Sequence, residues 1–312
     1  MCSGIDRKLY PKYMAKNKTV SLVLSSGGAR GLAHVGVIEE LERRGYTITE
    51  IAGCSAGALV GGMYAAGKLP EFKDWICNLD RVDVFSLMDF TFSSRGFIKG
   101  EKVYQALKKV VPDQAIEDLP LRFSCNAVDV NSGKEHVFAQ GSLYKAIRAS
   151  GSIPSVFLPA QIDKRNLIDG GVLNPVPISL LSDPHNTLVV VVNANSLAEH
   201  FLPAPHKKSS QKQSMNLPEW LMEYQNKMRT YFPEEEKKVQ QKRYSAMELV
   251  TRSFDLLQDR YCQLLLENYP VEVEIKVASS QAGTLEFHRA AELIEVGRIK
   301  ASEALDRLEN GN

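Results

Sequence analysis

"EIAGCSAGALVGGMYAAG", residues 50–67, joins a short apolar run to a stretch that is compatible with a helix. At the join, residues 53–57 have the pattern G-x-S-x-G. A strand before this motif and a helix after it predict a sharp turn that exposes the serine hydroxyl. Gly53 and Gly57 permit the tight turn, and the helix N-terminus favours negative charge beside Ser55. Ser55 is therefore a candidate nucleophile, and the alternative is a glycine-rich packing turn.

A second glycine loop lies in "LVLSSGGARGLAH", residues 22–34, where an apolar run again leads into a helix. Such a loop at a helix N-terminus binds negative charge. The loop is not a Walker motif, because no lysine followed by Ser or Thr stands in the required place, and "SGGARG" lacks the first glycine of G-x-G-x-x-G. An oxyanion fits better, because a glycine pair offers backbone N–H donors of the kind that acyl transfer needs.

A third motif supplies a carboxylate. In "NLIDGGVLNPVP", residues 166–177, Asp169 ends a short apolar run and precedes Gly170 and Gly171. A serine nucleophile needs a base. A carboxylate at a strand end beside a glycine turn can face another loop at the same edge of a sheet. Taken alone, Asp-Gly-Gly is usually only a turn, but beside the other two motifs it indicates the base.

The segments around these motifs alternate between strand and helix. Residues 19–25, 121–130 and 187–194 are apolar or β-branched runs of strand length, and the last is nearly continuous in apolar residues. Such a run is typical of a strand buried on both faces of a mostly parallel sheet. Residues 31–44 show an apolar stripe with helical spacing. The pattern predicts an α/β fold with three layers, α/β/α, and residues 128–139 predict a β-hairpin.

The chain changes character after residue 195. A polar, basic stretch with prolines predicts a mobile surface loop. The later segments are predicted as a loop at 203–214, a helix at 235–268, a strand at 271–277 and a helix at 285–308.

We therefore expect an N-terminal extension over residues 1–18 and one domain over 19–312. Within it, 19–195 form the catalytic core and 196–312 a mostly helical elaboration.

Composition excludes several classes of protein. The formal net charge of +1 over 312 residues gives no general attraction to nucleic acid. The five cysteines are scattered without a C-x-x-C pair, which disfavours a disulfide framework or zinc site and fits a reducing compartment. We expect neither metal nor cofactor, because no His/Asp/Glu cluster has metal spacing. Without a signal peptide or an apolar run near the roughly 20 residues of a membrane span, we expect a cytoplasmic protein with at most peripheral membrane contact. Nothing in the sequence sets the oligomeric state.

The motifs "SGGARG", "GCSAG" and "DGG" stand in the order found in the patatin-like phospholipases. That family carries GGGx[KR]G, GxSxG and DG[AG], and the chain resembles it over residues 19–195 and again near 285–305. Ser26 replaces the first glycine of the first motif, which fits if its backbone dihedral angles are ordinary.

The resemblance implies a catalytic Ser-Asp dyad that cleaves fatty-acyl esters of lipids through an acyl-enzyme intermediate. Ser55 would be the nucleophile and Asp169 its base. The oxyanion hole would consist of the Gly27, Gly28 and Ala29 amides, with Arg30 shaping the loop or balancing its charge. The remaining motif positions are Gly31, Gly53, Gly57, Gly170 and Gly171.

A Ser-Asp dyad has a chemical consequence. An aspartate with an ordinary pKa of about 4 is a poor base toward a serine hydroxyl. It becomes effective if water is excluded and an oxyanion hole meets the developing charge. We therefore expect a covered site and slower turnover than in a hydrolase assisted by histidine.

Histidines offer an alternative base. His185 follows Asp169 and formally completes a Ser-Asp-His order, but its place just before the strand at 187–194 predicts the opposite edge of the sheet. His34 is expected to pack or to form a hydrogen bond. The other four, expected at the surface or in loops, are His136, His200, His206 and His288.

Two other functions remain open. A malonyl-type acyltransferase also uses a serine elbow, but it would need a histidine partner and an arginine for the acyl carboxylate, and would lack DGG. A catalytically idle, lipid-binding scaffold would not react with a serine-directed organophosphonate. Residues 82–100 and 216–232 are rich in aromatic and apolar residues, and they either meet the acyl chain or a bilayer or pack against the α/β body.

Overall fold

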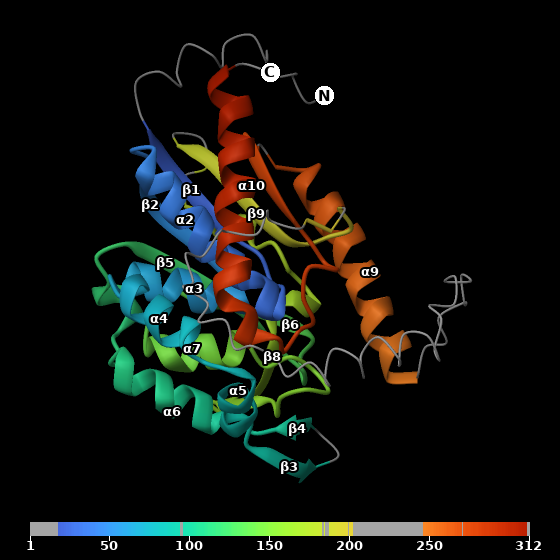
Figure 1. Cartoon of the computed structure of the whole chain (residues 1–312). Coiled ribbons are helices and arrows are strands. Elements are labelled where there is room, and N and C mark those ends of the chain that lie inside the picture. Colours follow the sequence, from blue (N-terminus) through green and yellow to red (C-terminus); the bar gives the residue numbers. More distant parts are fainter. Residues whose placement is uncertain are drawn as a thin grey trace, which may run out of the picture. The chain divides into compact units, whose positions relative to one another are not determined.

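A computed structural model describes residues 18–93, 96–182, 184, 187–198, 200–201, 246–269 and 271–310 (Figure 1). Residues 1–17, 203–214 and 216–232 lie outside the described residues, as does the first part of the helix predicted at 235–268. The chain divides into two compact units. One contains Met1–Pro203 with Phe254–Asn312, and the other contains Ala204–Ser253. Everything below concerns the first unit, except that one helix, α9, begins within the second.

Within the described residues, eight strands form one mixed sheet with the order β10-β9-β1-β2-β5-β8-β7, and β6 also pairs with β5. The pairs β10/β9, β9/β1, β1/β2 and β2/β5 are parallel, whereas β8 and β6 run antiparallel to β5. The strands are β1 (Thr19–Leu24), β2 (Thr47–Cys54), β5 (Arg122–Asp129), β6 (Lys134–Phe138), β7 (Ala160–Ile162), β8 (Arg165–Asp169), β9 (Leu188–Ser196) and β10 (Val273–Ala278).

Helices flank the sheet, and a separate hairpin pairs β3 (Phe90–Ser93) with β4 (Gly96–Ile98). The α-helices are α2 (Ala33–Arg43), α3 (Ala56–Ala65), α4 (Leu69–Cys77), α5 (Arg81–Leu87), α6 (Glu101–Val110), α7 (Leu143–Ser150), α9 (Ala246–Leu266) and α10 (Ala290–Asn310).

These elements confirm the predicted α/β class and its mostly parallel sheet. The strands predicted at 19–25, 121–130, 187–194 and 271–277 are β1, β5, β9 and β10, and β5 and β6 form the predicted hairpin. The helix predicted from residue 31 begins at Ala33, because Gly28–Leu32 first forms a turn of 3-10 helix. The last helix begins at Ala290 rather than 285, after a 3-10 turn at Phe287–Arg289.

The central strands are buried on both faces, as their apolar runs predict. Successive side chains of a strand point to opposite faces of the sheet. Leu22 and Leu24 of β1 belong to a core that includes residues of α2, α3 and α10. Val23 and Val191 instead pack with Cys262 in the later part of α9. The sheet is therefore covered on one side by helices that include α2, α3, α7 and α10, and on the other by the later part of α9.

Strand β5 brings the second and third motifs together. Its residue Asn126 pairs with Cys54 at the end of β2, and the next residue, Ala127, pairs with Asp169 at the end of β8. Strand β6 pairs with residues 125–129 of β5 and so occupies the other edge. Strands β2 and β8 therefore lie end to end along one edge of β5. This register places Asp169 beside the turn that follows Cys54.

Candidate active site

Ser55 occupies a strained turn between β2 and α3. Its φ of 55° and ψ of −115° make it one of four non-glycine residues with positive φ in the described part of the chain. Such a conformation is costly for a residue with a Cβ, and strain of this kind clusters at functional sites. The turn places Ser55 at the N-terminus of α3, and the residue is only 4% exposed.

The glycines of the motifs are required by close packing of backbone. A Cβ on Gly57 would overlap the carbonyl oxygen of Leu24, and one on Gly53 would lie 2.6 Å from the carbonyl oxygen of Gly57. A Cβ on Gly31, in the first loop, would overlap the Cβ of Ala56. The glycines therefore allow the end of β1, the first loop and the start of α3 to touch.

We expect Gly57→Ala to lower the free energy of unfolding by about 3 kcal/mol, because the added methyl group has no space against the Leu24 carbonyl. Urea unfolding followed by circular dichroism measures the change. Gly283→Ala is the matched control, since its Cβ would have its nearest neighbour at an ordinary 3.4 Å. Alanine is the better helix former by about 1 kcal/mol, so a stability gain for Gly57→Ala would contradict the packing argument.

Asp169 ends β8 and is buried. Its Oδ1 accepts a hydrogen bond of 2.8 Å from the Gly171 amide, and the Ser55 side chain lies near enough to influence the pKa of the carboxyl group. Burial raises the pKa of Asp169 to about 6, although the interactions with Ser55, Gly171 and Cys54 work in the opposite direction. The two motifs thus bring Ser55 close to a carboxylate that is more basic than usual.

A polar side chain from β5 supports the Asp-Gly-Gly turn. The Asn126 amide donates hydrogen bonds to the Asn174 carbonyl (3.0 Å) and to Glu135 Oε1 (2.8 Å). A Cβ on Gly170 would overlap Asn126 Oδ1, which explains the glycine after Asp169. Sequence reasoning missed Asn126, although a polar residue inside the apolar run of β5 is a signal that could have indicated it.

The first loop approaches Ser55 through Gly28. Its φ of 56° lies in the left-handed region, and Gly28 lines the same cavity as Ser55. Among the described residues, no hydrogen bond joins the Gly27 or Gly28 amide to another group. The Ala29 amide differs, because it donates to the Thr284 carbonyl at 2.9 Å. Of the three expected oxyanion donors, Ala29 already has a partner in this conformation.

Arg30 does not line the cavity, and its side chain links the first loop to neighbouring segments. The guanidinium donates to the Ala194 carbonyl (3.0 Å), the Ala282 carbonyl (3.2 Å) and Asn195 Oδ1 (3.4 Å). Its Nη2 lies 3.7 Å from Asp255, and burial lowers the pKa of Arg30. These contacts favour the loop-shaping role among those considered for Arg30.

Ser26 does not have a positive φ, since it is not among the described non-glycine residues in that region. Serine therefore fits the first glycine position of the motif. The Ser26 hydroxyl accepts a hydrogen bond of 2.8 Å from Asn195 Nδ2. Gln258 Nε2 lies 3.5 Å from the same oxygen and donates to the Gly171 carbonyl at 2.9 Å. Gln258 thus connects Ser26 of the first loop with the Asp-Gly-Gly turn, and sequence reasoning missed both Gln258 and Asn195.

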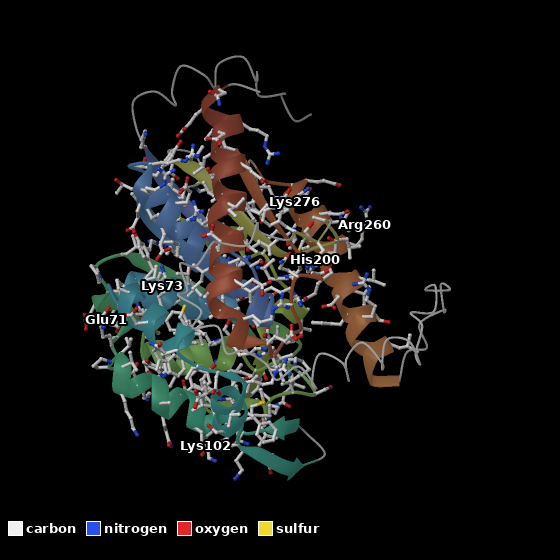
Figure 2. The ribbon with its side chains drawn as sticks, in the orientation of Figure 1. Glu71, Lys73, Lys102, His200, Arg260 and Lys276 are labelled. Carbon is white, nitrogen blue, oxygen red and sulfur yellow. The ribbon has the colours of Figure 1, made fainter. Side chains whose placement is uncertain are left out.

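No histidine of the described residues hydrogen-bonds to Ser55 or Asp169. His34 confirms its expected role, because its Nε2 lies 2.9 Å from the Ser25 carbonyl and burial lowers its pKa to about 4. His200 is exposed (Figure 2), whereas His136 lies in β6 with its ring edge-to-face against Phe138. His288 is half-buried in the 3-10 turn before α10, and His185 and His206 lie outside the described residues.

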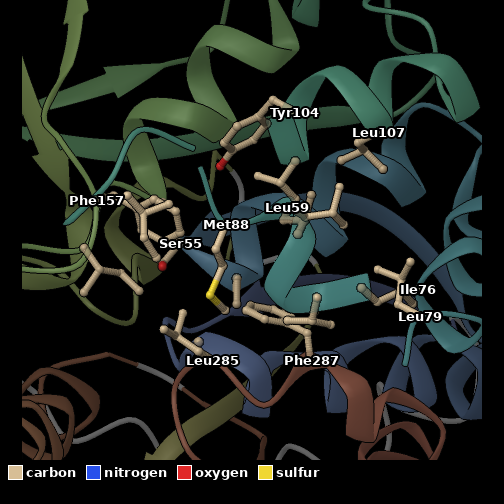
Figure 3. Close-up of a pocket in the computed structure, with 18 of the residues that line it drawn as sticks. Ser55, Leu59, Ile76, Leu79, Met88, Tyr104, Leu107, Phe157, Leu285 and Phe287 are labelled. Carbon is tan, nitrogen blue, oxygen red and sulfur yellow. The ribbon is translucent and has the colours of Figure 1, made fainter. Parts of the chain in front are cut away.

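An apolar cavity of about 120 Å³ opens beside Ser55 (Figure 3). The serine hydroxyl lies at its wall, and the other lining side chains are mostly aliphatic or aromatic. The predicted stretch 82–100 contributes to the wall, while its Phe85 is 64% exposed. From that stretch the lining residues are Val84, Leu87, Met88 and Ile98.

Metal-ligand clusters and membrane-spanning helices are both absent from the described residues. These residues contain no group of three or more His, Cys, Asp or Glu side chains that could hold a metal ion. None of their helices combines the length and the apolar character needed to cross a bilayer.

An α/β sheet with a G-x-S-x-G turn beside an apolar cavity is consistent with the family that the three motifs suggest. The model of the patatin-like phospholipases matches residues 22–182. The chain belongs to the patatin-like phospholipase family.

Individual relatives agree with this assignment. An uncharacterised NTE family protein of Mycobacterium tuberculosis is 33% identical over 331 residues, which cover 93% of this chain and 92% of that protein. The lysophospholipase NTE1 of Scheffersomyces stipitis is 31% identical over 188 residues, which cover 58% of this chain but only 12% of that protein.

Solved structures give more distant similarities. VipD from Legionella pneumophila matches with a TM-score of 0.47 and 14% identity, over 93% of this chain and 67% of that chain. ExoU of Pseudomonas aeruginosa, in complex with SpcU, matches with a TM-score of 0.39 and 14% identity, over 94% and 52%.

Proposed function

We propose that the chain is a serine acyl hydrolase that cleaves fatty-acyl ester bonds of lipids, with Ser55 as nucleophile and Asp169 as base. One observation carries the proposal. The Ser55 side chain lies at an apolar cavity, and the strand register places the buried Asp169 carboxyl group beside the same turn. The lysophospholipase name of the yeast relative supports the same substrate class.

In the first half of the reaction, Ser55 Oγ attacks the ester carbonyl carbon while its proton passes to Asp169. The tetrahedral oxyanion is held by the amides of Gly27 and Gly28, and the positive end of the α3 dipole adds to its stabilisation. When the intermediate collapses, the alcohol leaves with the proton from Asp169, and the acyl group stays on Ser55. Water then attacks the acyl-enzyme carbonyl carbon while its proton passes to Asp169. Collapse of this second intermediate returns the proton to Ser55 Oγ and releases the fatty acid.

Burial of Asp169 makes a carboxylate an adequate base for this step. Its pKa of about 6 is closer to the operating pH than that of an exposed aspartate, and proton transfer is efficient under that condition. The strained Ser55 backbone acts as a nucleophile elbow, since it holds the hydroxyl at the start of a helix. The site therefore needs no histidine.

The cavity favours a fatty-acyl group over the malonyl group of the rival acyltransferase function. A malonyl carboxylate requires a cationic partner, usually arginine. Among the described residues that line the cavity, none carries a charged side chain. In contrast, transfer of an aliphatic chain from water to this apolar wall is favourable, because it buries apolar surface.

The pKa of Asp169 predicts the pH dependence of hydrolysis. The base works only when ionised, so kcat/KM for a neutral short-chain ester is expected to fall tenfold per pH unit below about pH 6. Above that pH the carboxylate is ionised and the rate is level. Stopped assays between pH 4.5 and 8.5 measure the profile. A fall in kcat/KM centred near pH 7, absent from the profile of His185→Ala, would instead indicate a histidine base.

The experiment that tests the function compares p-nitrophenyl esters of short and long acyl chains with a phospholipid and a lysophospholipid. The proteins are the wild type, Ser55→Ala, Asp169→Asn and His185→Ala. We expect the first two variants to be inactive and His185→Ala to be active. If Asp169→Asn is active while His185→Ala is not, the assignment of Asp169 as the base is wrong. If the wild type neither hydrolyses any ester nor reacts with a serine-directed organophosphonate, the result would favour the catalytically idle scaffold.

A further inference from the structure

The end of α7 contacts the backbone of both proposed reacting residues. The Ser150 hydroxyl accepts a hydrogen bond of 2.8 Å from the Ser55 amide. Two residues later, the Ser152 carbonyl accepts one of 2.9 Å from the Asp169 amide. Ser55 and Asp169 follow different strands, yet a segment of three residues reaches both. This segment therefore fixes the two backbones relative to each other.

The bond from Ser150 supports the strained part of the site. Ser55 has a φ of 55°, a conformation that persists only where the surrounding structure determines it. Ser150 is fully buried, so water does not compete for its hydrogen bond with the Ser55 amide. Without it, the buried Ser55 amide would lack a hydrogen bond, and such a loss is costly. The turn would relax, and Ser55 Oγ would shift relative to Asp169.

Arg148 stabilises the segment 150–152 through hydrogen bonds. Its Nη1 donates to Ser152 Oγ at 2.5 Å, and its Nη2 donates to the carbonyls of Lys99 (2.6 Å) and Leu158 (2.9 Å). The guanidinium also lies 5.8 Å from the centre of the Tyr104 ring. Lys99 and Leu158 belong to different segments, so Arg148 connects the end of α7 with both of them.

The same segment continues into the wall of the cavity. Gly151, Ile153 and Phe157 all line it, and the Arg148 guanidinium lies 5.9 Å from the centre of the Phe157 ring. Ser150 is not among the lining residues. A change at Ser150 would therefore act on Ser55 without removing a contact with an acyl chain.

We propose that Ser150 is a positioning residue for ester hydrolysis. Its hydroxyl holds the Ser55 backbone in the turn from which Oγ reaches both Asp169 and an ester in the cavity. This inference rests on the proposed function, and it separates Ser150 from residues that bind substrate. Its effect falls on kcat, because the cavity that binds the acyl group stays intact.

The test compares Ser150→Ala with Ser142→Ala on the same helix. Ser142 caps the other end of α7, where its half-buried hydroxyl accepts the Lys145 amide at 3.2 Å and donates to Asp113 Oδ2 at 2.7 Å. Each variant removes a serine hydroxyl that accepts a backbone N–H, but only one contacts Ser55. The measurements are kcat and KM on p-nitrophenyl butyrate, the rate of labelling by a fluorophosphonate, and the thermal midpoint.

We expect Ser150→Ala to lower kcat and the labelling rate by about tenfold or more, with KM within about twofold. Ser142→Ala should keep kcat within about twofold even where it lowers the thermal midpoint. Ser150→Thr retains the hydroxyl and should recover most of the lost kcat. If Ser150→Ala does not fold, Ser150→Cys serves instead. A thiol accepts hydrogen bonds weakly, so kcat should again fall.

Two results overturn the inference. One is wild-type kcat in folded Ser150→Ala or Ser150→Cys, and the other is a loss no larger than that of Ser142→Ala. Ser55→Ala distinguishes this failure from failure of the proposed function. If Ser55→Ala is inactive while Ser150→Ala is fully active, only the positioning role is wrong. If Ser55→Ala is active, the proposed function itself is wrong.

Discussion

Ser55→Ala is expected to reduce kcat/KM for every acyl ester by about 10⁴-fold or more, because it removes the hydroxyl proposed to form the acyl-enzyme. The residual rate would come from binding and from the oxyanion hole alone. The fold should survive, since alanine keeps the Cβ and the amide that bonds to Ser150. Initial rates on p-nitrophenyl butyrate, measured with separately purified batches, give the ratio.

Ser132→Ala is the control for Ser55→Ala. Ser132 lies exposed in the turn between β5 and β6, where its hydroxyl donates only to Asp129. It should leave kcat/KM unchanged. An active Ser55→Ala protein, free of wild-type contamination by mass spectrometry, would show that another residue is the nucleophile.

Asp169→Asn is expected to lower kcat by about 10³-fold or more, because an amide cannot accept the serine proton. The same variant should be more stable than the wild type at pH 7.5. The side-chain carbonyl oxygen of the introduced asparagine would still accept the Gly171 amide, while the buried charge is gone. A pKa raised from 3.8 to about 6 corresponds to roughly 2 to 3 kcal/mol of penalty for the ionised folded state.

The pH dependence of this gain identifies its cause. Because the pKa is higher in the folded state, the folded protein binds more protons than the unfolded chain between about pH 3.8 and 6. The wild type therefore loses stability as pH rises through that window. The gain of Asp169→Asn should be small at pH 4 and complete above pH 6.5. Urea unfolding at both pH values measures it, and an equal gain at both would exclude the buried charge as the cause.

Much of the site is local in sequence and was predictable for that reason. A strand, a glycine motif and a helix follow one another without interruption around Ser55, and the glycines have close backbone neighbours that no other residue would fit. The continuous apolar run of β9 likewise predicts a central strand, because only burial on both faces tolerates it. Asp169 was predictable from its position at a strand end before two glycines.

Other parts depend on pairings that no local pattern records. The register of β5 puts Asp169 beside Ser55, and nothing in the β5 sequence indicates that its one edge takes two strands end to end. The Ser150 hydroxyl and the Thr284 carbonyl meet site amides only after the chain has folded. The cavity wall likewise combines residues from four short helices, α3 to α6, whose individual patterns predict only burial.

The most direct test of the account locates the covalent adduct. The wild type, Ser55→Ala and Asp169→Asn are treated with a fluorophosphonate, and peptide mass spectrometry identifies the modified residue and its rate of formation. The account predicts one adduct on Ser55 in the wild type, none in Ser55→Ala, and formation slowed by about 10²-fold or more in Asp169→Asn. An adduct on another residue, or an unchanged rate in Asp169→Asn, would contradict the Ser55–Asp169 pair as the catalytic centre.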